Sequence, residues 1–208
     1  MEKYHKYIFN AENKKFVGEF ERMYQDESKE GFDSWHQEDH RNLSRKIVLS
    51  ILQDYNFDSV IDIGCGKGSC THFLKKKNNK VIGVDVSKTA LEAAEQRYPD
   101  IDFLCMDIKK TDELEEFLSG VEKTENSLVV GREVFSYVEN WKDVLEIISR
   151  HTRYFLVSLY IPEGPIGFVK SGQDLMKEAE KHFEIIELVD NIKWDSIVIL
   201  GRSKNAGF

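Results

Sequence analysis

Residues 60–68 read Val-Ile-Asp-Ile-Gly-Cys-Gly-Lys-Gly, a β-branched apolar run that ends in three alternating glycines. Such a run predicts a buried strand that leads into a sharp turn. Gly64, Gly66 and Gly68 let the chain turn and let a ligand approach the backbone, because no Cβ stands in the way. A helix is expected to begin near Ser69. The stretch predicts a ligand-binding loop, although the glycines alone would also suit a tight turn without a ligand.

Short β-branched runs recur after residue 56 and alternate with segments of helical periodicity. The predicted strands are residues 59–63, 80–84, 101–105, 127–130, 154–160, 183–189 and 196–201. The predicted helices are residues 69–77, 88–97, 112–118, 141–151 and 173–182. Strand–helix alternation predicts an α/β fold whose mostly parallel sheet carries helices on both faces. The last two runs have no helix between them, so they are expected to form a C-terminal antiparallel hairpin.

The first 56 residues show a different pattern, with two apolar stripes at helical spacing. We expect residues 1–56 to form a helical cap or lid, and residues 57–208 to form the core domain. Between the stripes lies a polar stretch, residues 26–39, that contains Trp35 and His36. The stripes are Phe16, Phe20, Met23 and Tyr24, followed by Leu43, Ile47, Val48, Ile51 and Leu52.

Composition limits the partners and the compartment. Lys and Arg number 29 and Asp and Glu number 37, so the formal net charge is −8. This balance disfavours nucleic acid and anionic membranes as partners. The cysteines Cys65, Cys70 and Cys105 form no CxxC pair, so neither a disulfide framework nor a metal site is expected. No signal-peptide pattern opens the chain, and its apolar windows are too short to span a bilayer. We expect a soluble, cytoplasmic protein.

Three acidic residues stand at the ends of predicted strands. Asp62 lies within the first strand, Asp85 ends the second, 21 residues after Gly64, and Asp107 follows the third. An acid at the Asp85 spacing can accept both hydroxyls of an adenosine ribose; its alternative role is to cap the next helix. Dinucleotide loops usually read Gly-x-Gly-x-x-Gly, whose third position is Ser69 here. Asp62 would also repel a diphosphate, whereas it would favour a ligand with an ammonium group.

These motifs resemble class I S-adenosylmethionine-dependent methyltransferases of the small-molecule type over residues 58–152. The first family motif is matched by Val60–Gly68, the second by Val81–Ser87, and the adenine-side acid by Asp107. Glu133–Val138 is similar to the stretch that follows the fourth strand in the family. The resemblance implies a Rossmann-like sheet of seven strands and S-adenosylmethionine as the cofactor. It implies as cofactor-binding residues Asp62, Gly64, Cys65, Gly66, Gly68, Asp85, Val86, Met106, Asp107, Arg132 and Trp35, with Cys65 as a loop residue and not a nucleophile.

The acceptor is less well defined. The motif Asn/Asp-Pro-Pro-aromatic of base-modifying enzymes is missing after the fourth strand, where residues 131–134 read Gly-Arg-Glu-Val. We expect a small polar acceptor, with a sugar or nucleotide-linked sugar hydroxyl as the leading candidate. The alternatives are N-methylation of an amino sugar or small amine, a non-catalytic cofactor-binding subunit, and a nicotinamide dehydrogenase. A hydroxyl acceptor needs a general base, and the candidates are His36, His40, Glu133 and Tyr137. The oligomeric state stays open.

Overall fold

The computed structural model describes residues 4–10, 12–13, 15–37, 39, 41–121, 124–162, 167–191 and 195–205. Its centre is a seven-stranded sheet in the order β3-β2-β1-β4-β5-β7-β6. Strands β1 to β5 are parallel to one another, β7 pairs antiparallel with β5, and β6 pairs antiparallel with β7 at the sheet edge. The strand bounds are β1 Ser59–Ile63, β2 Lys80–Asp85, β3 Asp102–Cys105, β4 Ser127–Arg132, β5 Tyr154–Tyr160, β6 Phe183–Asn191 and β7 Ser196–Ser203. The predicted α/β fold with its C-terminal hairpin is confirmed.

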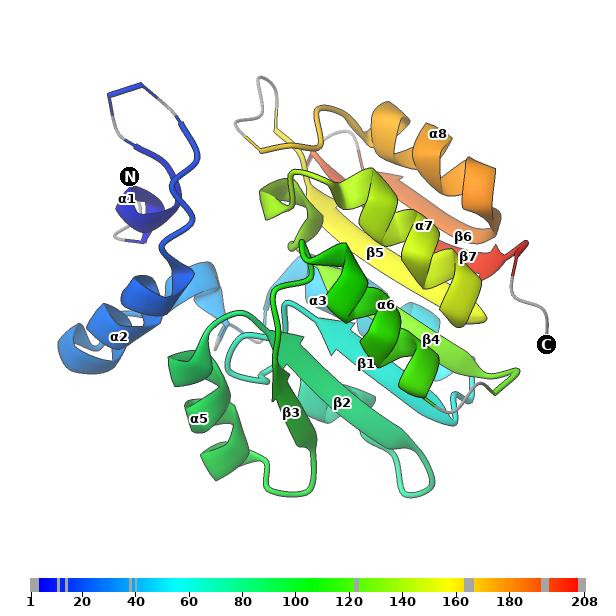
Figure 1. The fold of residues 1–208 in the computed structure, drawn as a ribbon, viewed down its shortest axis with the longest axis horizontal. Coiled ribbons are helices and arrows are strands. Elements are labelled where there is room, and N and C mark those ends of the chain that lie inside the picture. Colours follow the sequence, from blue (N-terminus) through cyan, green and yellow to red (C-terminus); the bar gives the residue numbers. More distant parts are fainter. Residues whose placement is uncertain are drawn as a thin grey trace.

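Helices cover both faces of this sheet (Figure 1). On one face α6, α7 and α8 lie side by side, and their apolar residues share a core with the central strands. On the other face α3 packs behind the sheet, and Val48 and Leu52 join a second core. The helix bounds are α1 His5–Ile8, α2 Phe20–Glu30, α3 Leu43–Gln53, α4 Thr71–Leu74, α5 Lys88–Arg97, α6 Thr111–Gly120, α7 Trp141–His151 and α8 Gly172–His182.

Burial explains why the strands form where the sequence predicts them. Every residue of β1 is buried, as expected for a central strand of a sheet that is covered on both faces. The pairing of Ile63 with Val84 on β2 and with Gly131 on β4 aligns the carboxyl ends of the three strands. The loops that follow these strands therefore meet at one edge of the sheet, where ligands bind in open α/β folds.

One predicted helix is much shorter than expected. The periodicity predicts a helix over residues 69–77, but α4 covers only Thr71–Leu74. Asn79 ends it: its amide nitrogen donates to the Leu74 carbonyl at 2.9 Å, and its amide oxygen accepts from the Lys76 backbone N–H at 2.7 Å. These bonds satisfy groups that a longer helix would have bonded internally, so the prediction was wrong beyond residue 74.

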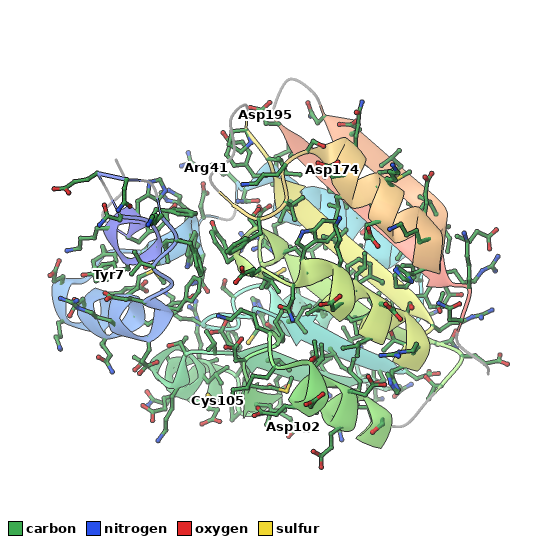
Figure 2. The ribbon with its side chains drawn as sticks, turned by 45° about the horizontal axis from the view of Figure 1, so that its top comes forward. Tyr7, Arg41, Asp102, Cys105, Asp174 and Asp195 are labelled. Carbon is green, nitrogen blue, oxygen red and sulfur yellow. The ribbon has the colours of Figure 1, made fainter. Side chains whose placement is uncertain are left out.

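The N-terminal residues form a unit beside α5 that we call the cap, the described residues from Tyr4 to Gln37 (Figure 1). Tyr7 lies among its helices (Figure 2), and the Tyr7 hydroxyl donates to Asp26 on α2 at 2.8 Å. Phe16 was predicted on the stripe of α2, but it lies before that helix, in a bridge with Phe9. Gly18, with φ 71°, turns the chain between the bridge and α2.

Packing thus separates two parts of the first 56 residues. The cap lies at one end of the sheet, whereas α3 belongs to the helix layer behind β5 and β7. No helix among the described residues has both the length and the apolar character that crossing a bilayer requires.

Candidate active site

A cavity of about 450 Å³ opens between the carboxyl ends of β1, β2 and β4 and the cap. Twelve of the residues proposed from the sequence meet there. Ten were proposed to bind the cofactor, and Glu133 and Tyr137 were proposed as general bases. The ten are Trp35, Asp62, Gly64, Cys65, Gly66, Asp85, Val86, Met106, Asp107 and Arg132.

The first two glycines of the loop are needed for different close approaches. All three glycines have positive φ, between 54° and 73°. A Cβ on Gly64 would lie 2.7 Å from Val134, and one on Gly66 would lie 2.6 Å from Gln37 Oε1 and 2.8 Å from the Tyr24 hydroxyl. The cap therefore touches the loop at Gly66, and any side chain there would push the cap away.

Gly68 does not line the cavity. The space that its Cβ would occupy is bounded by Tyr98 and Phe103, each 3.1 Å away. Gly68 packs the loop onto α5 and β3, and its place among the cofactor-binding residues stays a prediction. Because alternating glycines look the same in a sequence, spacing alone could not separate this role from that of Gly66.

Asp85 is buried at the end of β2 and organises two loops. One carboxylate oxygen accepts from the Gly66 backbone N–H at 2.8 Å, and the other accepts from the Ser87 backbone N–H at 2.9 Å. Burial raises the Asp85 pKa, and the backbone donors partly oppose that rise. Ser87, not Asp85, caps α5, because its side chain accepts from the Ala90 backbone N–H. Each Asp85 oxygen keeps lone pairs for ligand donors.

Asp62 and Arg132 form the second charged part of the lining. Asp62 Oδ2 accepts from the Thr71 hydroxyl at 2.6 Å. Burial raises the pKa of Asp62 to about 6, although Thr71 and the nearby Arg132 favour its charged form. Arg132 Nε and Nη1 are buried and have no hydrogen-bond partner. A guanidinium in this state favours an anionic ligand group that could accept from it.

Glu133 connects three segments at the edge of the cavity. It has φ 55°, a left-handed conformation that non-glycine residues rarely adopt. Its Oε2 accepts from the Tyr160 backbone N–H at 2.7 Å, and its Oε1 accepts from the Ser44 hydroxyl at 3.3 Å. Ser44 also bonds the Ser158 hydroxyl at 2.5 Å. Burial raises the Glu133 pKa, but both carboxylate oxygens already join β4, β5 and α3.

The other base candidates are placed differently. Burial raises the Tyr137 pKa far above its usual value, so this phenol stays neutral at neutral pH. His36 is exposed and does not line the cavity, so its proposed role as a general base stays a prediction. Its neighbour Trp35 adopts φ 63°, and this turn directs the two side chains differently. His40 lies outside the described residues.

Cys65 and Asp107 also line the cavity, in different surroundings. Cys65 lines the cavity and is buried, and burial raises the pKa of its thiol well above the usual value, which agrees with a non-nucleophilic role. Asp107 is partly buried, and one of its oxygens accepts from the Lys109 backbone N–H at 3.0 Å. Among the described residues, no group of three or more His, Cys, Asp or Glu is arranged to hold a metal ion.

Most of the lining residues that sequence reasoning missed come from the cap or from loop positions next to a motif. Apolar periodicity marks Phe20 and Tyr24, but it does not distinguish a core face from a ligand-facing one. Tyr4, His5 and Gln37 carry no periodic signal, because they lie in or beside helices of only three or four residues. The missed lining residues are Tyr4, His5, Gly18, Phe20, Tyr24, Gln37, Asn42, Ser69, Cys70, Val84, Ile108, Lys109, Val134 and Val138, whereas Tyr160, which also lines the cavity, was expected near the acceptor from its place at the end of its strand.

Ionic and polar contacts hold the cap over the loop. Lys67 Nζ lies 2.5 Å from Glu27 Oε1 and 3.5 Å from Asp33 Oδ1. The Lys67 backbone N–H donates to Gln37 Oε1 at 3.0 Å. This ion pair is largely shielded from water. Removing either partner of such a pair leaves the other charge uncompensated and destabilises the folded arrangement.

A second contact joins α2 to the start of α5. The Glu21 carboxylate accepts from the Ser87 hydroxyl at 2.7 Å and from the Thr89 hydroxyl at 2.6 Å. It also accepts from the Thr89 backbone N–H at 3.2 Å. A carboxylate at a helix N-terminus is stabilised by the helix dipole. The cap therefore contacts both segments that donate to the Asp85 carboxylate, the glycine loop and the start of α5.

Comparison with known proteins agrees with this geometry. Residues 61–153 match a family profile described as "Methyltransferase domain". The chain is 40% identical over 73 residues to "Putative methyltransferase 235L" of Invertebrate iridescent virus 6, covering 34% of this chain and 28% of that protein. It is 33% identical over 69 residues to trans-aconitate 2-methyltransferase of Afipia carboxidovorans, covering 32% of this chain and 27% of that protein. The matches thus span less than a third of these relatives.

Solved structures show the same fold. The N-methyltransferase NodS from Bradyrhizobium japonicum, in complex with S-adenosylhomocysteine, superposes with a TM-score of 0.67 at 17% identity. That match covers 87% of this chain and 98% of NodS. The resemblance to class I S-adenosylmethionine-dependent methyltransferases, which are enzymes that use this cofactor, is confirmed.

Proposed function

We propose that this chain, which carries a methyltransferase domain of the class I S-adenosylmethionine-dependent family, transfers a methyl group from S-adenosylmethionine to a small polar acceptor. The observation that carries the proposal is the presence of two buried carboxylates in one cavity at the carboxyl edge of the sheet. Asp85 and Asp62 are both buried, and both line the cavity beside the glycine loop. Such costly groups are retained where a ligand offers matching donors.

The two charged parts suggest how the cofactor lies. The free lone pairs of Asp85 suit the two ribose hydroxyls, and Asp107 lies on the adenine side. At the other end, Asp62 suits the ammonium group of the methionine moiety. The unpartnered Arg132 nitrogens suit its carboxylate. A zwitterion therefore matches the Asp62–Arg132 pair, whereas a dinucleotide diphosphate would meet Asp62 as a like charge.

Methyl transfer depends chiefly on alignment, because a sulfonium already carries a reactive methyl group. The cap contributes Tyr4, His5, Phe20 and Trp35 to the lining, so the closed cap would exclude water from the reacting atoms. The acceptor would enter between the cap and the ends of β4 and β5, where Tyr160 is exposed.

A sugar hydroxyl stays a candidate acceptor. One observation favours this possibility: His5, an imidazole from α1, lines the cavity and could take the hydroxyl proton. If so, His5→Gln should remove turnover with sugars and leave S-adenosylhomocysteine affinity unchanged.

The net charge of −8 supports a small-molecule acceptor and not nucleic acid. Free thiols are common in reducing compartments, and the three cysteines here are free. We propose the cytoplasm as the site of the reaction.

Titration calorimetry with S-adenosylhomocysteine tests the proposal, with NAD as the matched control. Selective micromolar binding of S-adenosylhomocysteine is expected. Transfer is then sought by incubating the protein and S-adenosylmethionine with pools of small polar compounds and looking by mass spectrometry for a gain of one methyl group. Absence of binding, or a preference for NAD, would overturn the assignment of the glycine loop. Binding without any transfer would favour a cofactor-binding subunit.

A further inference from the structure

Four aromatic rings line the acceptor end of the cavity, and they come from four separate segments. Trp35 lies 4.6 Å from Tyr4 and 5.2 Å from Tyr137, measured between ring centroids. Phe20 lies 5.8 Å from Tyr137 and meets it edge to face. All four residues contribute to the cavity wall. Tyr137 connects the rings of the cap to the loop that follows β4.

Backbone strain is concentrated at this cluster. Trp35 and His36 adopt φ 63° and 49°, and Glu133 adopts φ 55°. Each left-handed residue of this kind costs about 1–3 kcal/mol, and such strain tends to persist at functional sites. The strained turn at Trp35 places the indole on the cavity wall while the next side chain stays exposed. An aromatic ring that served only to fill the core would not need this turn.

The charge of the cavity lining as a whole favours a cation. The described lining contains four carboxylates, Asp62, Asp85, Asp107 and Glu133, against two cationic side chains, Arg132 and Lys109. Burial and the charge of the nearby Glu133 both raise the pKa of Tyr137, and Glu133, like Tyr137, lines the cavity, so a carboxylate adjoins the aromatic cluster. Aromatic faces with a nearby carboxylate bind alkylated ammonium groups through the ring quadrupole and charge attraction.

We propose that the aromatic cluster of Tyr4, Phe20, Trp35 and Tyr137 binds a cationic amine, and that the acceptor is an amine nitrogen. This inference rests on the proposed function. The acceptor ammonium first loses a proton to solvent. Its lone pair then forms a bond to the methyl carbon while the carbon–sulfur bond breaks, and that electron pair stays on sulfur. The positive charge passes from sulfur to nitrogen, so no change of net charge occurs in the step, and the methylated product again presents a cation to the rings.

The test compares two probes of nearly the same shape on protein saturated with S-adenosylhomocysteine. Choline carries a quaternary ammonium, and 3,3-dimethylbutan-1-ol replaces its nitrogen with carbon. We expect calorimetry to show choline binding at least tenfold more tightly than the neutral alcohol. Tyr137→Leu should remove this preference, whereas Tyr137→Phe should keep most of it because the ring remains. Phe16→Leu is the control, since Phe16 packs on Tyr137 but does not line the cavity.

The outcomes separate the two proposals. Failure to bind S-adenosylhomocysteine would overturn the proposed function itself. Normal binding of S-adenosylhomocysteine, with equal affinity for choline and the alcohol or with no affinity for either, would overturn the amine inference alone. If Tyr137→Leu lowers the melting temperature so far that it cannot be titrated, the wild-type comparison and Tyr137→Phe still decide.

Discussion

Replacing Asp85 with alanine gives a direct test of how the cofactor is held. Asp85 accepts one backbone N–H on each carboxylate oxygen, at 2.8 and 2.9 Å, and it lines the cavity. A net hydrogen bond to a charged group contributes roughly 1.5–3 kcal/mol, so two ribose hydroxyls set an upper limit of about 6 kcal/mol. Because such paired bonds are not additive, we expect a loss of about 3 kcal/mol, which is roughly 150-fold in Kd.

The substitution also removes the acceptor of two backbone N–H groups, which would weaken binding through the loop alone. A ligand-side change separates the effects. The 2′-deoxy analogue of S-adenosylhomocysteine should bind the wild type at least tenfold more weakly than the parent compound does. Both ligands should bind Asp85→Ala with similar affinity. Calorimetry measures all four combinations. If removing the 2′-hydroxyl from the ligand lowers its affinity for the wild type and for Asp85→Ala by the same factor, Asp85 does not contact the ribose, and the orientation proposed for the cofactor is wrong.

Three further substitutions test other parts of the site. Asp62→Asn should stabilise the cofactor-free protein by about 3 kcal/mol at pH 7.5 and about half as much at pH 5, while it weakens cofactor binding. The reason is that the folded-state pKa of Asp62, about 6, exceeds its unfolded value, so the wild type loses stability as the pH rises from about 4 to 6. Urea unfolding of both proteins at the two pH values measures the stability difference between variant and wild type. A difference that is no smaller at pH 5 than at pH 7.5 would contradict this reasoning. Lys67→Met leaves the buried Glu27 without its cation and should speed S-adenosylhomocysteine release by roughly thirtyfold, from a loss of about 2 kcal/mol. Stopped-flow measurement should show the release rate returning part of the way to the wild-type value when Glu27→Gln is added, and lack of such recovery would argue against the ion pair as the cause. Gly66→Ala should weaken S-adenosylhomocysteine binding because its Cβ would lie 2.6 Å from Gln37 Oε1 and 2.8 Å from the Tyr24 hydroxyl. Adding both Gln37→Ala and Tyr24→Phe should restore part of the affinity, and no restoration would leave backbone strain as the explanation.

The proposals also explain why the cap carries so many contacts. Tyr24 and Gln37 reach the glycine loop, while Trp35 and Tyr4 reach the acceptor end. One rigid segment therefore contacts both halves of the cavity. Lys67 couples the two, since its side chain pairs with the cap and its backbone N–H donates to Gln37. An acceptor wall built from the same segment that covers the cofactor is complete only when the cap is closed.

The sheet and its ligand loop could be predicted because their signals are local. A buried parallel strand needs an apolar run, and β1 and β5 match their predicted bounds. The turn after β1 needs glycine, because its left-handed backbone would strain other residues. Parallel topology then brings the ends of β1, β2 and β4 together without further information. For this reason the family resemblance could assign Asp62, Asp85 and Arg132 to one ligand site, and the structure brings them into one cavity.

The cap and the roles of its residues could not be predicted in this way, since they depend on contacts between segments far apart in the chain. Ser44 and Glu133, 89 residues apart, bond each other, and Glu133 also binds the backbone of β5; a candidate base thereby becomes a connection between strands. Gly66 and Gly68 look alike in the chain, yet one faces the cap and the other packs on Phe103. Local residue preferences place strands, turns and their acids. Which side chains then face the ligand depends on how packing buries each surface, and that is a property of the whole folded chain.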